Sequence, residues 1–262
     1  MKKNLVLFDM DGTLTESRQK FDSFLLDSLL HLSEVADIGI VTGSDYDYLT
    51  EQMSSVIQHP RICNSLHLLP CNGTKYYKYV SDSFCLSADS DMRRFIGEKY
   101  FKCLMQALTE YQWKVSSRGD MPLTGNFISF RGSLVNWCPI GRNANNEDRK
   151  AFQDMDIENV FRNVWLDRLR RYMDHLFDGE EILTCKLGGD TSFDIYPAGW
   201  DKTFCLSHFD HYKTKWFVGD RCYPNGNDYE IYKELEGNSY KTSCPKQTEE
   251  IINDVILRIK YQ

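Results

Sequence analysis

The chain has 262 residues, 42% of them hydrophobic, and it carries a formal net charge of −7. This length predicts one large domain or two modest ones, and the apolar content supports a packed core rather than a disordered chain. An acidic chain with no long run of basic residues argues against a nucleic-acid partner.

Cysteine usage and the N-terminal sequence indicate a cytoplasmic protein without a membrane anchor. The nine cysteines form no Cys-x-x-Cys pair, so no zinc motif is visible. Their odd number and irregular spacing fit free thiols in a reducing compartment. The first apolar run covers only residues 5–8 before Asp9 interrupts it. A membrane helix would need roughly 20 apolar residues.

The first eighty residues alternate between strand and helix patterns. Asn4–Phe8 is a short apolar run that predicts a buried strand, and residues 38–41 predict a second one. Residues 21–35 and 46–57 have helical spacing, and Ser44 or Asp45 would cap the second helix. This alternation predicts a parallel sheet with crossover helices.

The middle of the chain changes character. Long helices are predicted over residues 89–111 and 159–177. Strands are predicted over residues 113–116, 126–131, 133–138 and 182–187, with glycine-containing turns typical of antiparallel pairing. Helices on an antiparallel sheet make an α+β unit.

The α/β pattern then returns. Residues 192–196 and 215–218 predict strands, and residues 228–235 and 247–259 predict helices. We therefore expect an α/β protein with a Rossmann-like core built on a parallel sheet, made of residues 1–83 and 190–262. Residues 84–189 would form an inserted α+β cap domain with an antiparallel sheet.

The strongest chemical signal lies at the end of the first strand, in Asp9-Met10-Asp11-Gly12-Thr13. Ligands of open α/β sheets bind at this edge, where Asp9 can act as a nucleophile toward phosphorus. Asp11 is placed to exchange a proton with a substrate hydroxyl. Free amides at Gly12 and Thr13 would hold phosphate oxygens. An ordinary turn, in which Asp and Gly are common, is the bland alternative.

A second acidic motif, Gly219-Asp220, follows another apolar strand, and Asp228 comes shortly after it. Mg²⁺ prefers oxygen ligands, so the metal candidates are Asp9, Asp11 through a backbone carbonyl, Asp220 and Asp228. Asp228 would serve either as a ligand or by orienting the ligands. Taken alone, Gly-Asp after a strand is more often a turn.

Two further elements complete the set. The hydroxyls and amides of Thr42-Gly43-Ser44 can bind a transferred phosphoryl group, although the same residues can simply cap a helix. Lys202 can offset the charge of a phospho-aspartate, although most lysines are merely solvated.

These four elements, in this order, resemble the haloacid dehalogenase superfamily of phosphotransferases. Within it, the chain is similar to the eukaryotic-type phosphomannomutases over most of its length, with a patchy match between about residues 46 and 125. The most specific segments are Phe130-Arg131-Gly132, Glu147-Asp148-Arg149, and residues 136–142 and 188–197.

The resemblance implies interconversion of mannose 1-phosphate and mannose 6-phosphate, with glucose phosphates as further substrates, and a place in GDP-mannose biosynthesis. Asp9 would be the phosphorylated nucleophile, Asp11 the general acid/base and Lys202 the group that steadies the phosphoenzyme. Mg²⁺ would be the metal, and a hexose 1,6-bisphosphate the activator. The substrate would be bound by Arg18, Arg131, Arg142, Arg149, Ser192 and Asp194. Arginine forks match phosphate oxygens, although surface salt bridges are their usual fate.

Two rival functions stay open. A Mg²⁺-dependent sugar-phosphate phosphatase would share Asp9, Asp11, Lys202 and Asp220, and Thr42 favours it because these mutases carry glycine there. The retained arginines favour the mutase, since a simple phosphatase needs no second phosphate site. A binding protein without turnover would lack the nucleophile or a metal-binding acid. The apolar middle segment permits a homodimer through the cap, but a monomer's core would use the same residues.

Overall fold

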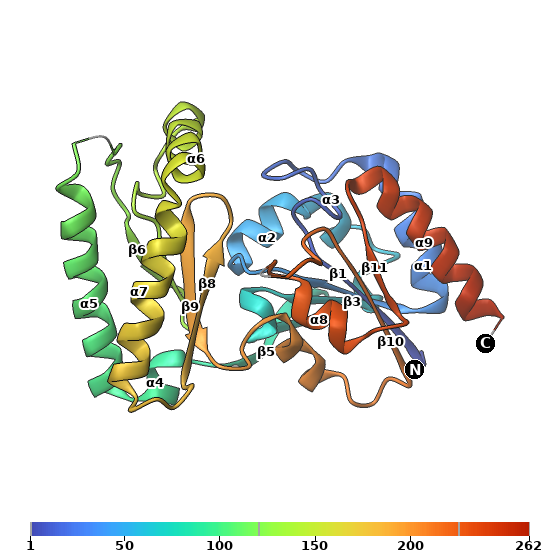
Figure 1. Cartoon of the computed structure of the whole chain (residues 1–262). Coiled ribbons are helices and arrows are strands. Elements are labelled where there is room, and N and C mark those ends of the chain that lie inside the picture. Colours follow the sequence, from blue (N-terminus) through green and yellow to red (C-terminus); the bar gives the residue numbers. More distant parts are fainter. Residues whose placement is uncertain (1, 120, 225, 262) are drawn as a thin grey trace. The chain divides into compact units, whose positions relative to one another are not determined.

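The protein is described by a computed structural model over residues 2–119, 121–224 and 226–261 (Figure 1). The chain divides into two compact units. The core unit consists of Met1–Asp89 and Trp200–Gln262, and the inserted unit of Ser90–Gly199. Among the described residues, no helix is both long and apolar enough to cross a membrane.

A seven-stranded sheet forms the centre of the core unit, in the order β11-β10-β1-β2-β3-β4-β5. Neighbours from β11 to β3 run parallel, whereas β4 pairs antiparallel with both β3 and β5. The strands are β1 (Asn4–Phe8), β2 (Asp37–Val41), β3 (Leu66–Leu69), β4 (Lys75–Val80), β5 (Ser83–Asp89), β10 (Thr214–Gly219) and β11 (Ser239–Lys241).

Both faces of this sheet are covered, which explains why its central strands are apolar without a break. Side chains alternate along β1: Val6 and Phe8 join one buried cluster, and Leu5 and Leu7 join another. Helices α1 and α9 lie side by side in Figure 1 and pack on the Val6 face. The helices of the core unit are η1 (Ser23–Leu25), α1 (Leu26–Val35), α2 (Tyr46–Gln52), α3 (Ser54–Ile57), η2 (Cys63–Ser65), η3 (Cys71–Gly73), η4 (Lys202–His208), α8 (Tyr229–Glu234) and α9 (Pro245–Lys260).

The inserted unit has a four-stranded antiparallel sheet in the order β6-β7-β9-β8. Trp137 of β7 stacks on Phe193 of β9, and its indole nitrogen donates a 2.8 Å hydrogen bond to Gln112 of α5. The elements are α4 (Met92–Ile96), α5 (Glu98–Ser116), β6 (Ile128–Phe130), β7 (Val135–Trp137), α6 (Asn146–Asn159), α7 (Phe161–Leu176), β8 (Leu183–Gly188) and β9 (Ser192–Pro197).

The fold class matches the expectation from sequence, but the boundaries of the insertion differ. β5 completes the core sheet, so the insertion starts near residue 90 rather than 84. The strand at 192–197, predicted as part of the core, pairs with β7 and β8 instead, so the insertion ends near 199 rather than 189. Nothing in the residue pattern of this strand indicates which of the two sheets it joins.

Two local predictions in the inserted unit are wrong. The predicted strand at 113–116 is the last turn of α5, because Leu104, Leu108 and Val115 continue one buried helical stripe while Trp113 is exposed. The stretch between the predicted strand at 133–138 and the predicted helix at 159–177, for which no helix was predicted, contains helix α6. It is mostly polar, and the reciprocal cap between Asn145 and Asp148 starts it.

Candidate active site

Three of the predicted motifs lie at one edge of the core sheet. β1 lies between β2 and β10, and all three strands run in the same direction. Asp9 follows β1, Thr42 follows β2 and Asp220 follows β10. The Asp9 amide donates a 2.9 Å hydrogen bond to the carbonyl of Val218. The hydrogen bonding between β1 and β10 therefore continues as far as the motif.

Three carboxylates meet at this edge. Asp9, Asp220 and Asp228 each offer an oxygen, and these oxygens lie within 4.8 Å of one another. The ammonium group of Lys202, which is 1% exposed, donates to both Asp9 and Asp228. Lysine offsets one of the three negative charges, and a divalent cation would offset the other two. The donor set therefore fits a hard cation such as Mg²⁺.

The charges in this cluster act strongly on one another because little water screens them. The pKa of Asp9 is raised to about 8, mainly by burial; Lys202 opposes this rise, and Asp228 and Asp220 add to it. Burial likewise raises the pKa of Asp220 to about 6. For Lys202, burial works in the lowering direction, but Asp228 and Asp9 raise its pKa overall. The ammonium form is thus held by its two carboxylates.

Gly12 is required where the chain turns beside this cluster. Its φ of +87° is unfavourable for other residues, and a Cβ atom there would overlap the Asp220 carboxylate. The expectation of free amides at this turn is wrong. The amide of Gly12 donates to the carbonyl of Thr15 at 2.7 Å, and that of Thr13 to the carbonyl of Met10 at 3.3 Å. Both amides therefore donate to carbonyls within the turn itself and not to a ligand.

The Asp11 side chain lies outside the carboxylate cluster, so a metal-ligand role would fall to its backbone carbonyl. Its Oδ1 accepts from the amide of Arg18 at 3.0 Å and from the hydroxyl of Tyr48 at 3.1 Å. Arg18 has a φ of +63°, and its side chain is exposed. Burial and the Asp11 carboxylate raise the pKa of Tyr48, so this phenol is a hydrogen-bond donor at neutral pH. The sequence analysis missed Tyr48.

The segment Thr42-Gly43-Ser44 forms a turn fixed from two sides. The Thr42 hydroxyl accepts from the amide of Ser44 at 3.1 Å. The amide of Asn72 donates to the carbonyl of Thr42 at 2.8 Å, and that of Cys71 to the carbonyl of Ser44 at 2.8 Å. Of the two expected caps of the following helix, Asp45 is the one used.

The inserted unit brings four of its predicted residues into one network. Arg142 donates to the Asn136 side chain at 3.1 Å, and Asn136 donates to Ser192 at 3.0 Å and to Asp194 at 2.7 Å. Arg149 donates to the backbone carbonyl of Arg142 at 3.2 Å. Asn136 and Asp194 are paired across β7 and β9, which places them on one face of the sheet.

Asn136 and Arg131 belong to the same region of the inserted unit. Asn136 is the centre of the network, yet it appeared in the sequence analysis only as part of a motif. Arg131 follows β6, where its amide donates to the carbonyl of Leu134 at 2.9 Å across the turn. Both arginines at 142 and 149 thus have side chains fixed by polar partners of the inserted unit, as a site for phosphate oxygens requires.

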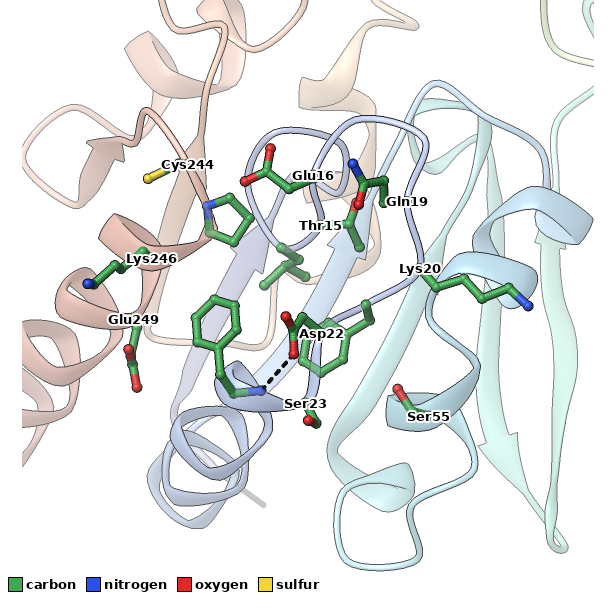
Figure 2. Close-up of a pocket in the computed structure, with 14 residues that line it drawn as sticks. Thr15, Glu16, Gln19, Lys20, Asp22, Ser23, Ser55, Cys244, Lys246 and Glu249 are labelled. Carbon is green, nitrogen blue, oxygen red and sulfur yellow. Dashed lines mark hydrogen bonds between the residues drawn. The ribbon is translucent and has the colours of Figure 1, made fainter.

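A separate cavity of about 800 Å³ lies in the core unit, between the loop that follows Thr13 and the start of α9 (Figure 2). Lys20 and Lys246 point away from each other on its two sides, and Glu16, Asp22 and Glu249 also line it. Among the described residues that line it there is no member of the carboxylate cluster. The candidate chemistry therefore lies outside this cavity.

Comparison with known proteins places the chain in a family. The sequence model of the eukaryotic phosphomannomutases matches residues 25–258. The chain belongs to this family. It is 35% identical to a phosphomannomutase of Schizosaccharomyces pombe, over 94% of this chain and 91% of that protein. It is 34% identical to a Drosophila melanogaster phosphomannomutase, over 96% and 95%. Family membership accords with the resemblance read from the motifs.

Solved structures with a similar fold are more distant in sequence. A truncated Plasmodium falciparum IMP-nucleotidase matches with a TM-score of 0.66 and 13% identity, over 98% of this chain and 71% of that one. An Aspergillus fumigatus trehalose-6-phosphate phosphatase matches with a TM-score of 0.53 and 17% identity, over 98% and 93%. At these identities the likeness concerns the fold alone.

Proposed function

We propose that the chain interconverts mannose 1-phosphate and mannose 6-phosphate through a phosphorylated Asp9, with glucose phosphates as further substrates. The observation that carries the proposal is the group formed by the buried Asp9, Asp228 and Lys202 with the half-buried Asp220 at the end of β1, in a chain of the phosphomannomutase family. A carboxylate beside a buried lysine and at a cation site has the surroundings that a nucleophile toward phosphorus needs.

The transfer begins from phospho-Asp9, which a hexose 1,6-bisphosphate would form. A hydroxyl oxygen of the sugar phosphate attacks the phosphorus, the bond between phosphorus and Asp9 breaks, and Asp11 takes the hydroxyl proton. The product is a sugar bisphosphate. When its other phosphorus meets the free Asp9 carboxylate, Asp9 attacks, the bond to the sugar oxygen breaks, and Asp11 returns the proton to that oxygen.

Other residues hold charges in place during these steps. Lys202 stays between Asp9 and Asp228 and offsets the charge that Asp9 carries before and after transfer. Mg²⁺, held by Asp9, Asp220, Asp228 and a carbonyl near Asp11, would neutralise charge on the phosphoryl oxygens. We assign Thr42, Gly43 and Ser44 to the transferred phosphoryl group. The remaining substrate phosphate and the sugar are assigned to Arg18, Arg131, Arg142, Arg149, Ser192 and Asp194.

We propose a cytoplasmic protein whose partner is a small sugar phosphate, and a homodimer formed through the inserted unit. Trp113 and Ile157 of that unit are 68% and 80% exposed, which supports such a contact. Analytical ultracentrifugation of the whole chain would contradict the dimer if the mass were that of a monomer at micromolar concentration.

The activity is tested by phosphorus NMR on purified protein with Mg²⁺, mannose 1-phosphate and a catalytic amount of glucose 1,6-bisphosphate. We expect mannose 6-phosphate with little inorganic phosphate, and no turnover after exhaustive chelation of the metal. Asp9→Asn should be inactive, whereas Asp27→Asn, at an exposed carboxylate in the first turn of α1, should be as active as the native chain.

Three results would overturn parts of this proposal. Inorganic phosphate as the main product would mean that the enzyme is a phosphatase. Undiminished turnover in Asp9→Asn would exclude Asp9 as the nucleophile. Full activity without divalent metal would exclude the Mg²⁺ role of the carboxylate cluster. A repeat with glucose 1-phosphate ranks the two sugars.

A further inference from the structure

The hydrogen bonds around Asp11 point to a role for a residue that no motif contains. The Tyr48 hydroxyl donates to Oδ1 of Asp11 at 3.1 Å, although the two residues are 37 positions apart in sequence. The amide of Arg18 reaches the same oxygen at 3.0 Å. Two donors therefore converge on one oxygen of the carboxylate, and the hydrogen bonds of the described residues leave Oδ2 as the oxygen for proton exchange.

We propose that Tyr48 is a positioning residue for Asp11, which fixes the carboxylate so that Oδ2 exchanges the proton during phosphoryl transfer. This inference rests on the proposed acid/base role of Asp11. Tyr48 does not itself touch the reacting atoms. It restricts rotation of a side chain that is only half-buried, and a general acid/base must be held within hydrogen-bond reach of the oxygen that it serves.

The backbone around Tyr48 is itself fixed. Asp45 caps α2, and its side chain accepts the amide of Tyr48 at 3.0 Å. The ring therefore starts from a defined position in the first turn of α2, and its hydroxyl reaches from that helix to the motif that follows β1. The link joins two separate strand ends, so it orients Asp11 relative to the turn at Thr42 that we assign to the transferred phosphoryl group.

Closure of the catalytic loop does not account for this bond. The loop from Met10 to Arg18 already closes through its own backbone, with Gly12 and Asp11 bridged to Thr15 and with the Arg18 amide on Asp11. The Tyr48 hydroxyl adds a second donor from outside the loop. Hydrogen bonds to charged groups are stronger than those between neutral groups, so this second donor favours one rotamer of the half-buried carboxylate.

The test is a comparison of Tyr48→Phe with Tyr46→Phe in steady-state conversion of mannose 1-phosphate. Tyr46 lies two residues earlier on α2 and stacks on Tyr77, so its variant loses a hydroxyl from the same helix away from Asp11. For Tyr48→Phe we expect kcat to fall by about tenfold or more, since general acid/base catalysis is worth 10²–10⁴-fold. KM and the Mg²⁺ concentration for half activity should change less than about twofold, and Tyr46→Phe should keep the native kcat.

Asp11→Asn, measured in parallel, distinguishes failure of the acid/base role of Asp11 from failure of the positioning role of Tyr48. If Asp11→Asn is inactive and Tyr48→Phe has native kcat, the role of Tyr48 is refuted while the proposed function stands. If Asp11→Asn retains full activity, the acid/base role of Asp11 fails, and the inference fails with it. A rise in KM at constant kcat, or equal losses in Tyr48→Phe and Tyr46→Phe, would also overturn the positioning role.

Discussion

Replacing Lys202 by methionine tests whether the buried charges at the end of β1 depend on one another. Methionine has a similar length and no charge, so the main change is the loss of an ammonium group that donates to both Asp9 and Asp228. Asp228 is completely buried and Asp9 is 4% exposed. Removing one partner of a buried ion pair costs about 3–5 kcal/mol, because the other partner is left uncompensated.

This cost should be visible in thermal unfolding of the metal-free protein. For domains of this size, 1 kcal/mol shifts Tm by about 2–4 °C, so we expect a loss on the order of 10 °C. Saturating Mg²⁺ should recover part of it, because the cation binds the same carboxylates in the folded state only. Calorimetry of Lys202→Met with and without Mg²⁺ measures both effects.

The matched control is Lys213→Met, at an exposed lysine just before β10, which should change stability by less than about 0.5 kcal/mol. If Lys202→Met lost no more stability than this control, the buried cluster would not be held together by the lysine. The electrostatic account of the site would then be wrong.

Three further predictions concern His67, Gly12 and Arg142. His67 is buried between the hydroxyls of Tyr212 and Tyr76, and burial lowers its pKa to about 4. Protonation is thus disfavoured in the folded state, and the free energy of unfolding should fall as pH falls from 6.5 to 4, by ~3 kcal/mol at most from this group. His67→Gln should flatten that part of the urea-denaturation pH profile, and an unchanged slope would contradict the assignment. Gly12→Ala should raise the Mg²⁺ concentration for half activity at least tenfold through overlap with Asp220. Gly237 has a similar positive φ but open space around it, so Gly237→Ala should leave that concentration unchanged, and equal behaviour of the two variants would refute the overlap. Arg142→Ala should raise KM for mannose 1-phosphate about tenfold or more with a native Tm, whereas unchanged kinetics would exclude Arg142 from phosphate binding.

The sequence located the catalytic edge well because its signals are local. A short apolar run followed by an acid marks where a buried strand ends, and parallel strands bring their carboxyl ends to the same edge of the sheet. Asp9, Thr42 and Asp220 could be placed together on that basis. The roles of Asp228 near the metal and of Lys202 beside Asp9 were inferred from motif and resemblance, and in the structure both side chains lie beside Asp9. The burial of Lys202 was not predicted.

Interactions between distant segments were harder to predict. Tyr48 and Asn136 lie on regular elements where nothing in their spacing marks them, and their significance comes from the partners that folding brings near. The prediction of free amides at Gly12 and Thr13 was wrong because of local interactions rather than distant ones. A tight turn satisfies its own donors before a ligand can use them, and the sequence does not show which donors the turn consumes.

Pairing of β1 with β10 has a consequence for how the enzyme is made. Asn4 pairs with Thr214, so these two neighbouring strands of the core sheet can be joined only after residue 214 has been synthesised. The contiguous inserted unit, residues 90–199, is complete before that point and can fold first. Pairings between segments this far apart form slowly, since loop closure must precede them. A chain interrupted before residue 202 would contain Asp9 but neither its lysine nor the two acids that complete the cluster, so the catalytic centre cannot assemble until Asp228 has been synthesised.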